Sequence, residues 1–299
     1  MTTLRAPHAS PAASYTEAMR RLRAFQARDD ASILPQAHTA VLERGERAPL
    51  AVVLLHGITN HPGQYARFAP LVYARGHNVL IPRMPEHGDV DRMTTRLRRL
   101  TAERLLGAAT EAVDIACGLG ERVCVLGIST SGLLCSYFAQ HRSDLARSVP
   151  VSPVFAMLRM PYALSLAVEK IGLALPNAFL FWDPRIKEKQ RPSTAYPRFS
   201  THALLQCLRI GDAVRTQSAS APPAADSVYV VTNREDPAVN NGVTAGVVER
   251  WKRLRPNAAA AFQFDGLPKN HDIIDPDNPL ARTEVVYPTL LAAIDATPS

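Results

Sequence analysis

The decapeptide VCVLGISTSG, residues Val123 to Gly132, contains the turn that decides the fold. An apolar run leads into a glycine, then Ser129, then more small residues. Two interpretations fit this pattern. The small residues could ease the packing of an ordinary strand-to-helix turn, or they could let a sharp turn hold a reactive hydroxyl above a sheet. In a parallel α/β sheet, functional groups collect at the carboxyl ends of the strands, where Ser129 would stand.

The bulk composition is that of an ordinary globular protein, with 46% hydrophobic and 20% charged residues in a chain of 299. This length suits one large α/β domain or two modest ones. The formal net charge is +7, but no nucleic-acid-binding motif accompanies it, so we expect no nucleic-acid partner. The four cysteines form no C-x-x-C pair, which favours free thiols in a reducing compartment. Without a membrane-length apolar run or a signal-peptide core, we expect a cytoplasmic protein with no stable membrane insertion.

Predicted strands and helices alternate along most of the chain, which favours a mainly parallel sheet covered on both faces. The strands are expected at residues 38–45, 51–57, 77–82, 122–127, 148–154, 227–233 and 259–264. The helices are expected at residues 15–28, 101–117, 132–141, 239–253 and 283–294. The alternation stops between residues 155 and 215, so this segment is expected to be an insertion above the sheet. The predicted organisation is a flexible tail (1–14), a core (15–154 and 216–299) and a cap (155–215).

Polar residues with complementary chemistry follow other predicted strands. The strand AVVLLHG ends at His56-Gly57, so the N–H of Ile58 could pair with that of Thr130 to bind an oxyanion. A serine hydroxyl also needs a base, and the base needs an orienting acid. Asp236 follows the strand SVYVVTN, and His271 follows the strand AAAFQF.

Each of these residues also has a simpler explanation. Ser129 could be a packing residue, and Asp236 could be a helix N-cap with Glu235 as the acid instead. Three other histidines compete with His271 as the base: His56, His61 and His87. The same three could form a metal site, which we consider less favourable because no carboxylate stands at ligand spacing. His56 is expected to order its own loop, and the other two precede Ser129 in the chain.

The order Ser129, Asp236, His271 is that of the α/β-hydrolases. Within that superfamily, the chain from about residue 45 to 295 resembles the monoacylglycerol lipase-like and carboxylesterase-like serine hydrolases. The pattern HG-x-x-x-H-x-x-x-Y is similar to theirs, and so is PRMPEHG at 82–88, which has Glu86 where glycine is usual. In the elbow motif G-x-S-x-G, Ser131 replaces the second glycine.

The resemblance implies an α/β-hydrolase fold, with a mainly parallel central sheet flanked by helices and a helical cap inserted after the sixth strand. It implies that Ser129 is the nucleophile, Asp236 the acid and His271 the base, with Ile58 and Thr130 as oxyanion donors. No metal or organic cofactor is needed for this chemistry.

The apolar residues of the cap suggest a hydrophobic acyl substrate. The candidates are Phe155, Met157, Leu158, Met160, Leu164, Leu166, Phe179, Phe181 and Trp182, of which Phe155, Met157, Phe181 and Trp182 are predicted to bind substrate.

The function expected from these observations is hydrolysis of carboxylic esters through an acyl-enzyme. The substrate would be a small-molecule ester, with a hydrophobic acyl group or a monoacylglycerol-like structure. A thioesterase, an amidase or peptidase, or an acyltransferase could use the same three residues. A non-catalytic ligand-binding protein of this fold is a further alternative, although it would tolerate their loss. The sequence leaves the oligomeric state open.

Overall fold

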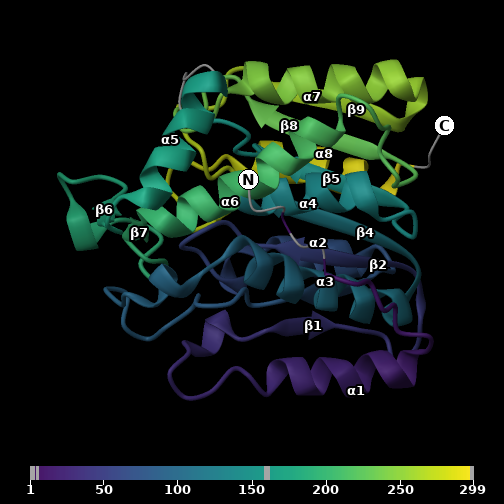
Figure 1. Ribbon diagram of the computed structural model, residues 1–299. Helices are drawn as coiled ribbons and strands as arrows, with labels where there is room; N and C mark the ends of the chain where they lie inside the picture. The colour runs from purple at the N-terminus through teal and green to yellow at the C-terminus, as the bar shows by residue number, and fades with distance from the viewer. Residues whose placement is uncertain (1–3, 5–6, 158–161, 297–299) are drawn as a thin grey trace.

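A seven-stranded sheet forms the centre of the computed structural model, which describes residues 4, 7–157 and 162–296 (Figure 1). The strand order is β1-β3-β2-β4-β5-β8-β9. These strands are β1 (Ala40–Leu42), β2 (Ala48–Leu55), β3 (Asn78–Ile81), β4 (Gly120–Ile128), β5 (Arg147–Val151), β8 (Val228–Asn233) and β9 (Ala259–Phe264). Only the pairing of β1 with β3 is antiparallel among these seven strands, so the predicted mainly parallel sheet is confirmed.

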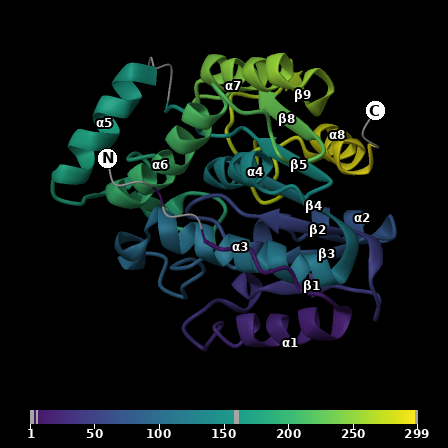
Figure 2. The same ribbon diagram turned by 45° about the vertical axis from the view of Figure 1, so that its right-hand side comes forward.

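Helices cover both faces of the sheet (Figure 2). One face packs against α2 (Phe68–Ala74) and α8 (Thr283–Asp295), and the other against α1 (Tyr15–Gln26), α3 (Ala102–Leu119), α4 (Thr130–His141) and α7 (Asn241–Leu254). Val52 of β2 belongs to the first core and Val53 to the second, because successive side chains of a strand point to opposite faces. Burial on both sides explains why the central strands are continuous apolar runs in the sequence.

Short 3₁₀ helices lie in the connections. They are η1 (Pro35–Ala37), η2 (Pro62–Tyr65), η3 (Arg96–Arg99), η4 (Lys187–Lys189) and η5 (Pro256–Ala258). Within the described ranges, no helix is both long and apolar enough to cross a bilayer.

The segment predicted as a cap contains α5 (Tyr162–Ala174), a hairpin of β6 (Phe179–Phe181) with β7 (Arg198–Ser200), and α6 (Thr201–Gln217). In Figure 1, α5 and the hairpin stand beyond one end of the main sheet. In contrast, α6 packs on α4 and buries Cys207 and Ile210 in the main core. The segment follows the fifth strand of the chain rather than a sixth, because the described residues ahead of β1 form α1 and no further strand.

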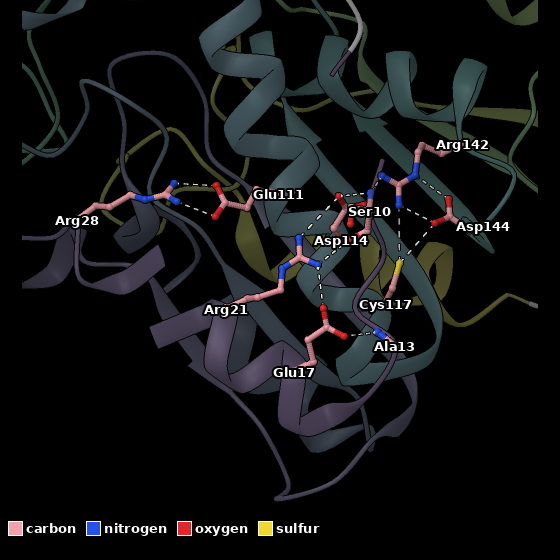
Figure 3. Close-up of polar contacts among 10 residues, drawn as sticks. All are labelled: Ser10, Ala13, Glu17, Arg21, Arg28, Glu111, Asp114, Cys117, Arg142 and Asp144. Carbon is pink, nitrogen blue, oxygen red and sulfur yellow. Dashed lines mark hydrogen bonds and ion pairs between the residues drawn. The ribbon is translucent and has the colours of Figure 1, made fainter. Parts of the chain in front are cut away.

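The last part of the expected N-terminal tail is held against the core (Figure 3). The N–H of Ser10 donates to the Asp114 carboxylate at 2.8 Å, and the N–H of Ala12 donates to the Asp114 carbonyl at 2.8 Å. Asp114 also pairs with Arg142 at 2.7 Å, and both side chains are buried. A buried carboxylate needs donors around it, and the N-terminal segment supplies one of them. Ser10 and Ala12, which lie in the expected tail of residues 1–14, are thus hydrogen-bonded to α3.

Candidate active site

Ser129 occupies a strained turn between β4 and α4. Its φ of 62° and ψ of −117° lie in a region that non-glycine residues rarely adopt, at a cost on the order of 1–3 kcal/mol. The N–H of Ser129 donates to the carbonyl of Val151 at 2.9 Å, which fixes the turn against β5. A Cβ at Gly127 would lie 2.8 Å from the carbonyl oxygen of Ser131, and one at Gly132 would lie 2.9 Å from Cα of Pro153. The small residues around Ser129 are therefore required by the close packing of strand, turn and helix.

Ser131 replaces the second glycine of the elbow motif without opening the turn. Its hydroxyl donates a hydrogen bond to the carbonyl oxygen of His56, the first residue after β2. Ser131 is buried, so this bond links the turn after β4 directly to the turn after β2. The register pairs Leu55 of β2 with Gly127 of β4, so both turns leave the sheet at the same edge.

The loop after β2 places the predicted oxyanion donor Ile58 beside Thr130, the residue after the predicted nucleophile. The N–H of Ile58 donates to Oγ1 of Thr130 at 3.1 Å, so the structure brings the two predicted donor residues into contact. The carbonyl of Gly57 lies 3.1 Å from the N–H of Asn60, and the N–H of Gly57 donates to Oε1 of Gln64 at 2.9 Å. Both peptide groups of Gly57 are thereby held in place.

His56 orders this loop as a neutral side chain. Its Nε2 accepts the N–H of Met84 at 3.0 Å, so Nδ1 carries the proton and donates to the carbonyl of Gly57 at 3.0 Å. Burial, with the neighbouring His87, holds the pKa of His56 well below its usual value. His56 therefore has a structural explanation, and its ring nitrogens are both occupied. Among the described residues, no group of three or more His, Cys, Asp or Glu side chains is arranged to hold a metal ion.

Asp236 and His271 form a direct pair at the ends of β8 and β9. Nδ1 of His271 lies 2.7 Å from Oδ2 of Asp236, whose side chain is fully buried. Oδ1 of Asp236 accepts the N–H groups of Ala238 and Val239 at 2.8 and 3.3 Å. The N-cap of α7 is Asn240, so Asp236 is not the helix cap that the simpler explanation required.

The environment of His271 favours its protonated form. Burial acts to lower the pKa, but the charge and hydrogen bond of Asp236, with the charge of Asp272, outweigh it and raise the pKa of His271 above 6.5. The Asp236 carboxylate also fixes the tautomer, because it accepts the proton on Nδ1 and leaves Nε2 free to take a proton.

The loop that follows β9 returns to the loop after β2. Nε2 of Gln64 donates to Oδ2 of Asp272 at 2.8 Å, and Nδ2 of Asn60 donates to Oδ2 of Asp275 at 2.8 Å. These contacts bring the neighbourhood of His271 across the sheet to the neighbourhood of Ile58. Gln64, Asn60, Asp272 and Asp275 were not among the residues predicted from the sequence. The available signals were that Gln64 and Asn60 lie inside the HG-x-x-x-H-x-x-x-Y pattern and that Asp272 directly follows His271.

The β6–β7 hairpin contacts the same β2 loop. Nε1 of Trp182 donates to Oγ1 of Thr59 at 3.0 Å, and the ring of Trp182 packs on Phe199 with centroids 4.2 Å apart. The N–H of Tyr196 donates to the carbonyl of Thr59 at 2.8 Å. The predicted cap and the predicted oxyanion loop are therefore joined at Thr59.

The other predicted substrate-binding residues lie in different environments. Phe155 is only 4% exposed and belongs to the main core, where it lies near Gly211 of α6. Met157 forms an isolated bridge with Val239, and Phe181 is partly buried in the hairpin. Leu158 and Met160 lie outside the described residues. The part of Phe155, Met157, Phe181 and Trp182 in substrate binding remains a prediction.

The chain matches a known protein family over most of its length. The sequence profile of the alpha/beta hydrolase family matches residues 52–283. This chain belongs to the alpha/beta hydrolase family. The match includes Ser129, Asp236 and His271, so the turn and the pair described above lie within the hydrolase domain.

The following relatives have low sequence identity to this hydrolase. It is 27% identical over 175 residues to a thermostable monoacylglycerol lipase from Bacillus sp. (strain H-257), a match that spans 55% of this chain and 63% of that lipase. Among solved structures, it resembles a monoacylglycerol lipase from Paleococcus ferrophilus (TM-score 0.65, 18% identity, 86% of this chain and 97% of that one). It also resembles a soluble variant of monoglyceride lipase from Saccharomyces cerevisiae (TM-score 0.66, 12% identity, 86% and 90%). At these identities the structural matches show the fold.

Proposed function

We propose that this hydrolase cleaves carboxylic esters through an acyl-enzyme formed on Ser129. The observation that carries the proposal is the 2.7 Å contact between Asp236 and His271, at the same sheet edge as the strained turn of Ser129. A serine in such a turn, a histidine with a fixed tautomer and a buried carboxylate are the parts that acyl transfer needs.

In this mechanism, Nε2 of His271 takes the proton of Ser129 as Oγ attacks the ester carbonyl. The N–H groups of Ile58 and Thr130 stabilise the oxyanion. The C–O bond to the alcohol then breaks, and His271 returns the proton to the leaving oxygen. Water repeats the sequence: His271 takes its proton, the hydroxide attacks the acyl group, and the released Ser129 oxygen recovers a proton. Because Ile58 donates to Oγ1 of Thr130 in the resting structure, that hydrogen bond must pass to the oxyanion when substrate arrives.

The substrate that we propose is an ester with a hydrophobic acyl group, such as a monoacylglycerol-like lipid. Two observations support this choice: the named lipase relatives and the apolar side chains of the segment from residue 155 to 215, such as Phe181 and Trp182. We propose that this segment acts as the cap. The cysteines Cys117, Cys124, Cys135 and Cys207 are all free thiols. Free thiols persist in a reducing compartment, which supports our proposal that the protein is cytoplasmic.

The test combines labelling with turnover. A fluorophosphonate probe should label the wild-type protein and fail to label Ser129→Ala. The wild type should hydrolyse p-nitrophenyl esters, with faster turnover of longer acyl chains. Acyl thioesters and anilides in the same assay distinguish the thioesterase and amidase alternatives. A folded wild-type protein that neither reacts with the probe nor turns over any ester would contradict the proposal and favour a ligand-binding role.

A further inference from the structure

Gln64 bridges the two loops that carry the proposed catalytic groups. Its side-chain oxygen accepts the N–H of Gly57 at 2.9 Å, and its side-chain nitrogen donates to the carboxylate of Asp272 at 2.8 Å. Gly57 directly precedes Ile58, and Asp272 directly follows His271. Gln64 is almost completely buried, so water competes little for either hydrogen bond.

At the first end of the bridge, Gln64 helps to set the direction of the Ile58 N–H. That N–H belongs to the Gly57–Ile58 peptide, whose carbonyl is held by Asn60 and His56. Glycine has the widest range of backbone conformations, so a peptide next to Gly57 can rotate unless both sides are held. The Gln64 contact supplies the hold on the N-terminal side of Gly57.

At the second end, Asp272 is itself held firmly. Its Oδ1 accepts the N–H groups of Ile274 and Asp275 at 3.2 and 3.1 Å, and its carbonyl accepts from the side chains of Asn270 and Asn278 at 2.6 and 3.0 Å. A contact made to Asp272 is therefore transmitted to the backbone beside His271.

We propose that Gln64 is a positioning residue, which fixes the oxyanion donor of Ile58 relative to the base His271 by joining Gly57 to Asp272. The proposal rests on the proposed function, since it assigns roles to these two groups. The alignment of an oxyanion donor and a base must hold within a fraction of an ångström for full activity. A side chain that binds both loops restricts their movement relative to each other.

The second contact between the loops, from Asn60 to Asp275, does not replace Gln64. The side chain of Asn60 also donates to Oδ2 of Asp272, at the longer distance of 3.4 Å, and its oxygen Oδ1 accepts the N–H of His61. The Asn60 side chain therefore connects the His271 loop to residue 61. It does not bind the N–H of Gly57, which donates to Gln64.

The first experiment compares two buried glutamines. Gln140 accepts from Nε1 of Trp251 and donates to the carbonyls of Ala221 and Pro222, on the α4 helix away from the loops in question. Gln64→Met should lower kcat for a p-nitrophenyl ester on the order of 10- to 100-fold with a smaller change in KM. Gln140→Met should lower the melting temperature and leave kcat close to wild type. If Gln64→Met matches Gln140→Met in both readouts, Gln64 is only a structural residue and the proposal is wrong.

A milder variant tests the same bridge if Gln64→Met does not fold. Gln64→Glu keeps the acceptor for Gly57 but, when ionised, cannot donate to Asp272 and repels it. The ratio of variant to wild-type kcat should therefore rise as the pH falls and the new carboxyl gains a proton. A ratio that stays constant with pH would overturn the proposal.

Ser129→Ala, measured in the same assay, separates the two levels of inference. If Ser129→Ala loses turnover and the Gln64 variants behave like wild type, the positioning role fails and the proposed function stands. If Ser129→Ala retains the ester hydrolysis of the wild type, the proposed function fails and the positioning role fails with it.

Discussion

The hydroxyl of Ser131 donates to the carbonyl oxygen of His56, and this bond joins the turn of the proposed nucleophile to the turn of the proposed oxyanion donor, beside the bond from Ile58 to Thr130. The residue that departs from the family's elbow pattern thus makes a contact that glycine cannot make. The departure adds a connection at the point where β2 and β4 leave the sheet.

Ser131→Ala should lower both stability and activity. It leaves the buried carbonyl of His56 without this donor, which costs about 1–3 kcal/mol in the free energy of unfolding. It also loosens the alignment of Ile58 with Ser129, so kcat should fall. Urea unfolding and ester turnover measure the two effects. Ser136→Ala is the matched control, because Ser136 is a buried serine of the same helix whose hydroxyl bonds the carbonyl of Gly132 at 2.8 Å. An equal loss of kcat in both variants would show that the His56 contact has no special part in catalysis.

The raised pKa of His271 sets the pH dependence of turnover. His271 must be neutral to accept a proton, so kcat/KM should rise with pH through a pKa above 6.5. Asp236→Asn removes the partner that raises this pKa and fixes the tautomer, so kcat should fall on the order of 10⁴-fold. A pH–rate profile with a midpoint below 6.5 in the wild type would contradict the assigned environment of His271.

The same shift predicts the pH dependence of stability. A histidine with a higher pKa in the folded state stabilises the fold while it is protonated. This contribution is fully present below the unfolded-state pKa and is lost as the pH rises through the folded-state pKa. Burial and the charge of Asp272 raise the pKa of Asp275 to about 7. The folded state therefore favours the neutral form of Asp275, and the protein also loses stability through this group as the pH rises toward 7. Urea titrations of wild type and His271→Ala at several pH values measure the contribution of the His271–Asp236 pair. The difference in stability between the two proteins should shrink as the pH rises, and a difference that does not change with pH would contradict the prediction.

Trp182→Phe should weaken the connection between the hairpin and the β2 loop. Phenylalanine can still pack on Phe199 but cannot donate to Thr59, so the hydrogen bond of about 1 kcal/mol is lost. We expect KM for long-chain esters to rise several-fold. Turnover of p-nitrophenyl acetate, which is too short to need the cap, serves as the comparison. Equal effects on short and long esters would place Trp182 outside acyl recognition.

Asp114 and Glu111 offer a contrast between a buried and an exposed ion pair on the same helix. Asp114→Ala leaves the buried Arg142 without one of its carboxylate partners and frees Ser10, so stability should fall by about 3–5 kcal/mol. Glu111→Ala removes the more exposed pair with Arg28 at 2.7 Å and should cost about 0–1 kcal/mol. Urea unfolding of the two variants checks the difference, and similar losses in both would contradict it.

The strands and the pairing of Asp236 with His271 could be predicted because they depend on local patterns. Apolar runs mark the buried strands, and a parallel sheet brings the residues after its strands to one edge whatever their distance in the chain. The position of Asp236 after β8 and of His271 after β9 follows from that rule.

Contacts between loops could not be predicted in this way. Gln64 and Asp272 are 208 residues apart, and no periodicity connects them. The β6–β7 hairpin was missed because its strands have three residues each, FLF and RFS, and a polar segment separates them. The hydrogen bond of Ser131 to His56 was also hidden, because the motif shows only that a small residue fits there.

The insertion after β5 divides the proposed site between two lengths of chain. Ile58, Ser129 and Thr130 precede it, whereas Asp236 and His271 follow it. They lie in the loops after β8, which pairs with β5, and after β9, which pairs with β8. During synthesis, the first length is made before the second, so it holds the proposed nucleophile while the β8 side of β5 is still uncovered. The proposed base joins only when β8 and β9 have added to that side. Ester hydrolysis by the proposed mechanism therefore has to wait until the chain has been made as far as His271.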